Sequence, residues 1–132
     1  MVTVADVRDL ALTLPRSYEA LVRDRVKFRV GRIVYLAFSR DEQWMGFAFP
    51  REERKSLVAG DPETFAMPRP SEMRYQWAEA RLERLTPEVM AELVVDAWCM
   101  AVPERVAAAH LATRARSSAR RRTSARRRTS AR

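Results

Sequence analysis

Residues Val26 to Phe38 read VKFRVGRIVYLAF and predict the central part of the fold. The first five residues alternate between apolar and basic side chains, which is the two-residue period of a strand with one buried face. Gly31 and Arg32 separate this run from a second, largely apolar run that begins at Ile33. Two such runs with a two-residue break that contains glycine predict a β-hairpin.

A third strand is predicted directly after this hairpin. The polar segment 39–42 reads SRDE and is typical of a turn, and residues 43–49, QWMGFAF, again favour a strand. The three strands would form an antiparallel meander whose middle member is apolar on both faces. We therefore expect helices or loops to cover both sides of this sheet.

Two helices are expected around the meander. Thr3 precedes an apolar stripe at helical spacing, Asp6 stands in a capping-box position, and Pro15 closes the run. A short second helix is expected to start at Pro50 and to end at Gly60.

Further helices are expected toward the C-terminus. Thr86 and Pro87 form a helix start, and the apolar stripe after them runs to Pro103, which interrupts it. A last helix is expected from Glu104 to about Leu111. Between the second and third helices, the three prolines in segment 61–70 predict a loop.

The segment from Tyr75 to Leu85 has a composition that favours a helix. Alanine, glutamate, arginine and leucine are good helix formers, and Ala78, Leu82 and Leu85 fit a helical spacing. Composition alone thus predicts a helix here.

The C-terminus carries the positive charge of the chain. Residues 118–132 read SARRRTSARRRTSAR, and nine arginines lie from Arg114 onward. The chain has 25 basic and 17 acidic residues, so removing these nine leaves 16 against 17, a balance of −1. We expect a folded domain over residues 1–112 and a basic tail over 113–132 that is disordered when free, because it lacks large apolar side chains.

Several function classes find little support. The single cysteine, Cys99, lies in an apolar run and is interpreted as a small core residue, and the single histidine, His110, has no second ligand at a useful spacing. The three glycines are isolated, so no phosphate-binding loop is present. We expect a non-enzymatic cytoplasmic protein without metal or cofactor, and neither an export signal nor a membrane anchor is expected.

Several short segments together resemble the MmcQ/YjbR family of small bacterial proteins. They are FRVGRIVY from Phe28, PETF from Pro62, YQW from Tyr75 with Leu82, and AW from Ala97 followed by VPERVAA from Val102. The resemblance implies an α+β fold of helix, three strands, helix, β-hairpin and C-terminal helices. It makes Trp77 to Leu82 a strand, against the local composition, and we follow it there.

Members of this family are compared in shape with a "double wing" DNA-binding domain, so the resemblance also implies a DNA-binding-like function. It supplies no catalytic or binding residues, and the arginine-rich tail lies outside the family pattern. Basic residues of the two hairpins and of the tail are the candidate phosphate contacts: Lys27, Arg29, Arg32, Arg69, Arg74, Arg120, Arg121, Arg122, Arg126, Arg127 and Arg128.

Two functional hypotheses follow. The preferred one is association with DNA or RNA, in which the tail supplies non-specific affinity and the hairpins, with Tyr75 and Trp77 as stacking surfaces, add contacts. Nearby acidic residues such as Glu79 weigh against binding by the folded part. The alternative is a protein-interaction or regulatory module, or a homodimer, that uses an apolar sheet face with Trp44, Phe47 or Tyr35.

Overall fold

The computed structural model describes the backbone of residues 1–130 and the side chains of residues 1–117, 119 and 120. The chain divides into two units, Met1–Val102 and the segment from Pro103 onward. The first unit contains three α-helices, six β-strands and two 3₁₀ turns: α1 (Val4–Ala11), β1 (Ser17–Val22), β2 (Arg25–Val30), β3 (Ile33–Phe38), β4 (Trp44–Ala48), α2 (Arg54–Gly60), β5 (Phe65–Ala66), η1 (Pro70–Glu72), β6 (Trp77–Arg81), η2 (Leu82–Arg84) and α3 (Pro87–Cys99).

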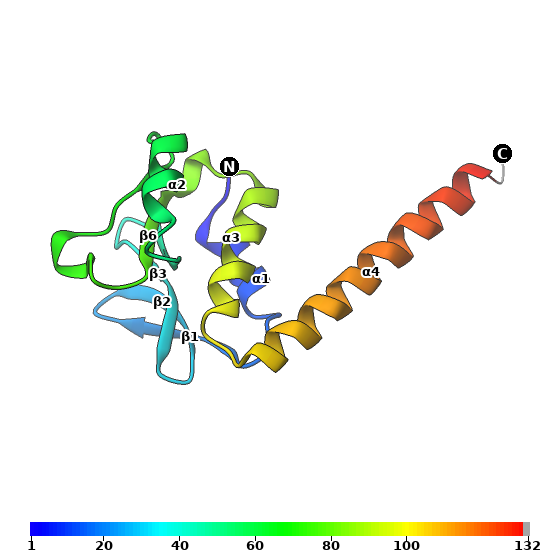
Figure 1. Cartoon of the computed structure of the whole chain (residues 1–132), viewed down its shortest axis with the longest axis horizontal. Helices are drawn as coiled ribbons and strands as arrows, with labels where there is room; N and C mark the ends of the chain where they lie inside the picture. Colours follow the sequence, from blue (N-terminus) through cyan, green and yellow to red (C-terminus); the bar gives the residue numbers. More distant parts are fainter. Residues whose placement is uncertain (131–132) are drawn as a thin grey trace. The chain divides into compact units, whose positions relative to one another are not determined.

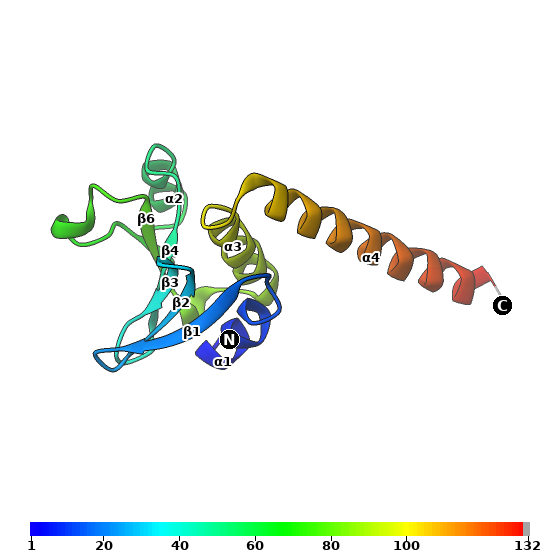
Figure 2. The same ribbon diagram turned by 90° about the horizontal axis from the view of Figure 1, so that it is seen from below.

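The strands form one six-stranded antiparallel sheet in the order β1-β2-β3-β4-β6-β5. The sheet stands between the helices α1 and α3 on one side and the long β5–β6 connection on the other (Figures 1 and 2). This arrangement confirms an α+β fold and the expected meander, which corresponds to β2, β3 and β4.

Strand β1 is absent from the sequence prediction. It pairs with β2 along its whole length, and Arg23 and Asp24 turn the chain between them with positive φ angles of 52° and 64°. Two consecutive left-handed residues are the geometry of a tight hairpin turn, usually signalled by Asn-Gly or Asp-Gly. The signal was missing because Arg-Asp fills the turn and because Ser17–Val22 has no fully buried face.

The core lies between the sheet and the helices α1 and α3. Phe28, Leu36 and Phe47 from the strands are fully buried there, together with Val7 of α1 and Trp98 of α3. The Trp98 indole N–H donates a hydrogen bond of 2.9 Å to the carbonyl of Pro15, which ties the end of α3 to the loop after α1.

The starts of α1 and α3 follow the sequence prediction. Thr3 and Asp6 form the capping box of α1, and Thr86 caps α3 by accepting a hydrogen bond from the backbone N–H of Val89. Helix α2 begins later than predicted, at Arg54 rather than Pro50. Residues 51–53 form turns instead, and the Glu53 N–H donates a hydrogen bond of 3.0 Å to the Pro50 carbonyl.

Strand β6 settles the ambiguous segment. The strand expected from the family resemblance is present at Trp77–Arg81, and the helix favoured by composition is wrong. Hydrogen-bonded neighbours on both sides, β4 and β5, outweigh a propensity that is worth only a few tenths of a kcal/mol per residue.

The second unit contains α4, Glu104–Ser130. The sequence predicts that this helix ends near Leu111 and that the tail beyond it is disordered when free, whereas in the structure the helix continues to Ser130. Alanine and arginine are good helix formers, and no glycine or proline follows Pro103 to end the helix. Among the helices of the described residues, none is long and apolar enough to cross a membrane.

Candidate nucleic-acid interface

The face of the sheet turned away from α1 and α3 carries the candidate site. Strand alternation sends Met45 and Phe47 of β4 into the core, so Trp44, Gly46 and Ala48 face the other way. On β6, Ala78 and Ala80 are buried, and Trp77, Glu79 and Arg81 take the opposite face. We call this second surface the open face.

A cavity of about 640 Å³ lies on the open face, within the range of ligand-binding pockets. Strands β2, β3, β4 and β6 supply its floor, and the β5–β6 connection supplies one wall. Its functional lining consists of three cations, two carboxylates and three aromatic rings: Arg25, Lys27, Arg69, Glu72, Glu79, Trp44, Tyr75 and Trp77.

Gly46 allows Trp77 to lie against the floor of this cavity. A Cβ atom at position 46 would stand 2.6 Å from Trp77 Nε1 and 2.7 to 2.8 Å from two neighbouring ring carbons. These separations are shorter than any side-chain contact allows, so the indole occupies the space that a larger residue would fill. The cavity therefore has an aromatic surface at its base.

A second hollow, of about 570 Å³, adjoins the cavity and shares Arg25, Ser39, Trp44 and Arg69 with it. It adds two further cations, Arg23 and Arg40, and one carboxylate, Asp41. Together the two hollows hold five cations and three carboxylates, so their walls have an excess of positive charge.

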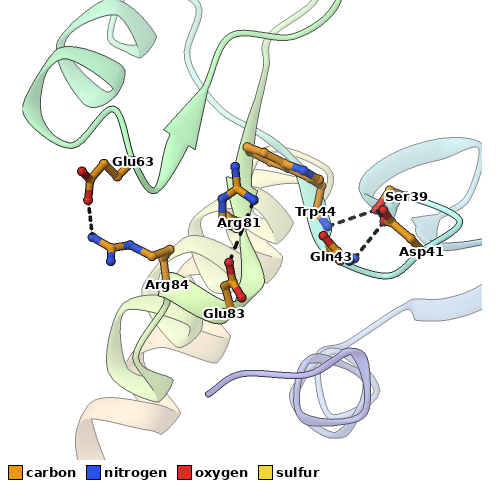
Figure 3. A network of polar contacts seen from close by, with 8 residues as sticks. All are labelled: Ser39, Asp41, Gln43, Trp44, Glu63, Arg81, Glu83 and Arg84. Atoms are coloured by element: carbon orange, nitrogen blue, oxygen red, sulfur yellow. Dashed lines mark hydrogen bonds and ion pairs between the residues drawn. The ribbon is translucent and has the colours of Figure 1, made fainter.

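The carboxylate of Asp41 is held by its own turn. It accepts hydrogen bonds from Ser39 Oγ at 2.6 Å and from the Gln43 backbone N–H at 3.1 Å (Figure 3). These hydrogen bonds, Ser39 first, lower the pKa of Asp41. Its negative charge thus stabilises the turn at the base of β4 and does not pair with Arg23 or Arg40 within the described side chains.

Arg81 covers part of Trp44. Its guanidinium carbon lies 4.5 Å from the centre of the Trp44 ring, a cation–π contact, and its Nη1 atom lies 3.9 Å from Glu83 Oε1 (Figure 3). The contact holds the indole of Trp44 in one orientation at the junction of the two hollows.

The wall that carries Tyr75 is held by arginines of the segment before and within α2. Arg54 is 5% exposed and donates hydrogen bonds to the carbonyls of Met73, Tyr75 and Trp77. Arg51 adds a hydrogen bond of 2.8 Å to the Arg74 carbonyl. A planar guanidinium can serve several carbonyls at once, so Arg54 fixes the backbone that positions Tyr75 and Trp77.

Glu79 lies near the middle of β6, opposite Gly46 of β4 and Ala66 of β5. Burial, and then repulsion by Glu72, raise the pKa of its carboxyl group, while Arg69 and Arg25 lower it. The partial burial of this carboxyl group disfavours its negative charge within the cavity.

The structure brings together two of the predicted contacts of the folded part. Lys27 and Arg69 both line the cavity, whereas Arg29, Arg32 and Arg74 do not. Arg29 Nε is buried without a hydrogen-bond partner among the described residues, and the Arg74 guanidinium stacks on Tyr75 at 4.8 Å and donates to its hydroxyl. Of the five candidate contacts in the folded part, Lys27 and Arg69 therefore lie at the cavity.

The tail contacts stay predictions. Arg120 is exposed on α4, and the side chains of Arg121, Arg122, Arg126, Arg127 and Arg128 lie outside the described part of the structure.

Sequence reasoning missed several lining residues. Arg25 was within reach, because it is in phase with Lys27 on the same strand face, one step before the expected start at Val26. Arg23 and Arg40 stand in turns, where no strand or helix periodicity predicts which way a side chain points. In the sequence, Glu79 is only an acidic residue that weighs against binding, and its place in the cavity cannot be inferred.

Cys99 and His110 show no sign of catalytic activation. Burial raises the pKa of the Cys99 thiol, which disfavours the thiolate, and burial lowers the pKa of His110. Within the described residues, no three side chains of His, Cys, Asp or Glu lie close enough to hold a metal ion.

The first unit has an α+β fold with one antiparallel sheet, and the open face of this sheet carries charged and aromatic side chains. The chain belongs to the YjbR family, whose model matches residues 12–100. It is similar to the crystal structure of the Deinococcus radiodurans protein DR2400, described as a DUF419 domain, with a TM-score of 0.67 and 22% identity over 76% of this chain and 78% of that one. No match was found among curated proteins.

Proposed function

We propose that this protein is a non-enzymatic, cytoplasmic nucleic-acid-binding protein that holds single-stranded segments on its open face. The observation that carries the proposal is the lining of the two adjoining hollows, where three aromatic rings stand among five cations. Proteins that bind single strands combine a positively charged groove with aromatic side chains on which bases stack. Stacking contributes about 1–3 kcal/mol per base.

The single-strand preference follows from the shape of the site. Trp44, Tyr75 and Trp77 line a cavity, so a base reaches them only when it is unpaired and turned out of a stack. The cations that share the walls, Lys27 and Arg69 among them, would meet the phosphates on either side of that base. A duplex offers phosphates but no base to the cavity, and we expect it to bind more weakly to the open face.

The tail supplies a second, non-specific source of affinity in this proposal. Its nine arginines could each neutralise a phosphate, and the logarithm of the affinity would then fall with the logarithm of the salt concentration with a slope of about −8. Its arginines are spread from Arg114 to Arg132 with no acidic residue between them. Such a distribution suits contacts with any polyanion and carries no sequence information.

The interaction-module alternative has less support. Of the three residues on which it depends, Tyr35 and Phe47 are fully buried in the core, and only Trp44 reaches the open face. Around Trp44 the two hollows mix charged side chains such as Arg25 and Arg69 with apolar ones such as Ala37 and Ala48.

The test compares the full chain with a full-length variant in which all nine arginines from Arg114 onward are replaced by glutamine. Binding of a labelled single strand and of its duplex is measured by fluorescence anisotropy over a salt series. We expect the variant to lose most of its salt dependence and to keep a preference for the single strand. If the variant binds neither, the open face is not the site. If the natural chain also binds neither at physiological salt, nucleic-acid binding itself is wrong.

A further inference from the structure

We propose that the cavity on the open face reads guanine, with the Glu79 carboxylate accepting hydrogen bonds from the N1–H and 2-amino groups of one unpaired base. The inference rests on the proposed function and adds a specificity to the same site.

Glu79 is a carboxylate placed inside a sheet. It lies on β6 between β4 and β5, and it points into the cavity that Trp77 and Tyr75 also line. The side chain of Glu79 does not contribute to the core, because Ala78 and Ala80 face the core on the opposite side of the strand. Its position fits a role toward something that enters the cavity.

The carboxylate of Glu79 lacks donors of its own. Among the side chains that the structure describes, none donates a hydrogen bond to it, and Arg25 and Arg69 influence it only through longer-range charge attraction. Burial and Glu72 both disfavour its ionised form. A ligand that brings N–H donors would therefore relieve an unfavourable situation, and hydrogen bonds to a charged group are worth about 1.5–3 kcal/mol.

The chemistry of the bases then selects guanine. An ionised carboxylate is purely an acceptor, with two oxygens side by side. The Watson–Crick edge of guanine presents two adjacent donors, N1–H and the 2-amino group, which match those oxygens. Adenine and cytosine each place a ring-nitrogen acceptor beside one amino donor, and uracil flanks its single N–H with two carbonyl acceptors. All three would set an acceptor against the carboxylate.

The rest of the cavity suits a purine nucleotide. Trp77, held against Gly46, provides an aromatic surface beside Glu79, and stacking is favoured for the larger purine ring system. Arg25 and Lys27 of β2 and Arg69 of the β5–β6 connection stand on other walls of the cavity and would receive the flanking phosphates.

The test uses the full chain and single-stranded uridine octamers that carry one central guanosine, inosine or adenosine. Inosine is guanosine without the 2-amino group, so it removes one of the two proposed hydrogen bonds. We expect the guanosine octamer to bind about tenfold more tightly than the inosine octamer. Glu79→Gln should abolish this difference, and Glu52→Gln, which removes an exposed carboxylate outside the cavity, should keep it. Thermal melting verifies that both variants are folded.

The outcomes separate the two proposals. If the three octamers bind equally well and Glu79→Gln changes nothing, the guanine inference is wrong and single-strand binding stands. If a guanosine preference survives Glu79→Gln, another group reads the base, and the inference is again overturned. If no octamer binds at physiological salt, the proposed function fails, and the guanine site fails with it.

Discussion

The open face of the sheet and the C-terminal tail are both basic, but they differ in what accompanies the charge. The tail holds nine arginines and no acidic residue, whereas the hollows of the open face combine five cations with three carboxylates and three aromatic rings. Unopposed charge attracts any polyanion, and mixed charge around a shaped cavity discriminates between ligands. In the proposed function, the tail would therefore supply affinity, and the carboxylates of the open face would supply specificity.

Neutralising the tail should have the largest effect. With all nine arginines from Arg114 onward replaced by glutamine, we expect affinity for nucleic acid at 50 mM salt to fall about a thousandfold or more, because counterion release is lost. Anisotropy titrations between 50 and 200 mM salt measure it. A variant with an unchanged salt slope would show that the folded unit, not the tail, supplies the electrostatic affinity.

Removing the Arg54 guanidinium should show that the backbone of the cavity wall depends on its hydrogen bonds. Arg54→Met leaves the carbonyls of Met73, Tyr75 and Trp77 without their buried donor, and we expect a loss of about 3 kcal/mol in the free energy of unfolding. Urea denaturation provides the measurement. Arg51 is exposed and makes one such hydrogen bond, to the Arg74 carbonyl, so Arg51→Met should lower the free energy of unfolding by less than about 1 kcal/mol.

Charge on the open face should matter by position. We expect the double substitution Lys27→Gln and Arg69→Gln to weaken single-strand binding about tenfold, since both residues line the cavity. Arg32→Gln removes an exposed charge of the β2–β3 turn, outside the cavity, and should change affinity less than twofold. Equal losses of affinity in the two variants would mean that single-strand binding depends only on net charge and not on the position of the cations.

Filling the space under Trp77 should disturb the cavity without changing any charge. A Cβ atom from Gly46→Ala collides with the indole, and we expect about fivefold weaker single-strand binding and a cost of about 1–3 kcal/mol in stability. Tryptophan fluorescence reports the displaced ring. Gly60→Ala is the matched control, because no atom lies within 4 Å of its added Cβ, and it should leave binding unchanged.

The smallest effect concerns stability and pH. Burial and Glu72 raise the pKa of Glu79 above the ordinary 4.5, so its ionised form destabilises the folded state. Glu79→Gln should therefore melt slightly higher than the natural chain above the raised pKa, and the difference should vanish as the pH falls below about 4.5. A lower melting temperature at pH 8 would indicate that Glu79 supports the fold rather than a ligand.

Local sequence patterns predicted an element correctly where its residues interact mainly with their neighbours in the sequence. The Thr3–Asp6 capping box, the Thr86 cap and the β2–β3 hairpin could all be predicted, because neighbours in the sequence supply their hydrogen bonds or their alternation. Such patterns were insufficient for β1, whose turn lacks the usual residues, and for the length of α4. For β6 they pointed to the wrong element, and only the family resemblance corrected it.

The candidate site was predictable only in part, since its residues come from segments that lie far apart along the chain. The alternation of β2 predicts that Lys27 lies on one face of a strand. Arg69 belongs to the proline-rich loop and is close to Tyr75 in the sequence. Nothing in the sequence indicated that Arg23, Arg40 and Arg69 meet, or that Gly46 lies under Trp77. The contact of Gly46 with Trp77 depends on the pairing of β4 with β6, which are far apart along the chain.

The charge distribution, the helix caps, the central hairpin and the family could be predicted without the structure, because they depend on residue types and on short-range spacing. Tertiary structure decided which face of the sheet stays open and where Glu79 points. The physical reason is that a side chain becomes a binding group only through its neighbours across the sheet. The arginine-rich tail needs no such neighbours, so its proposed affinity can be inferred directly from its composition.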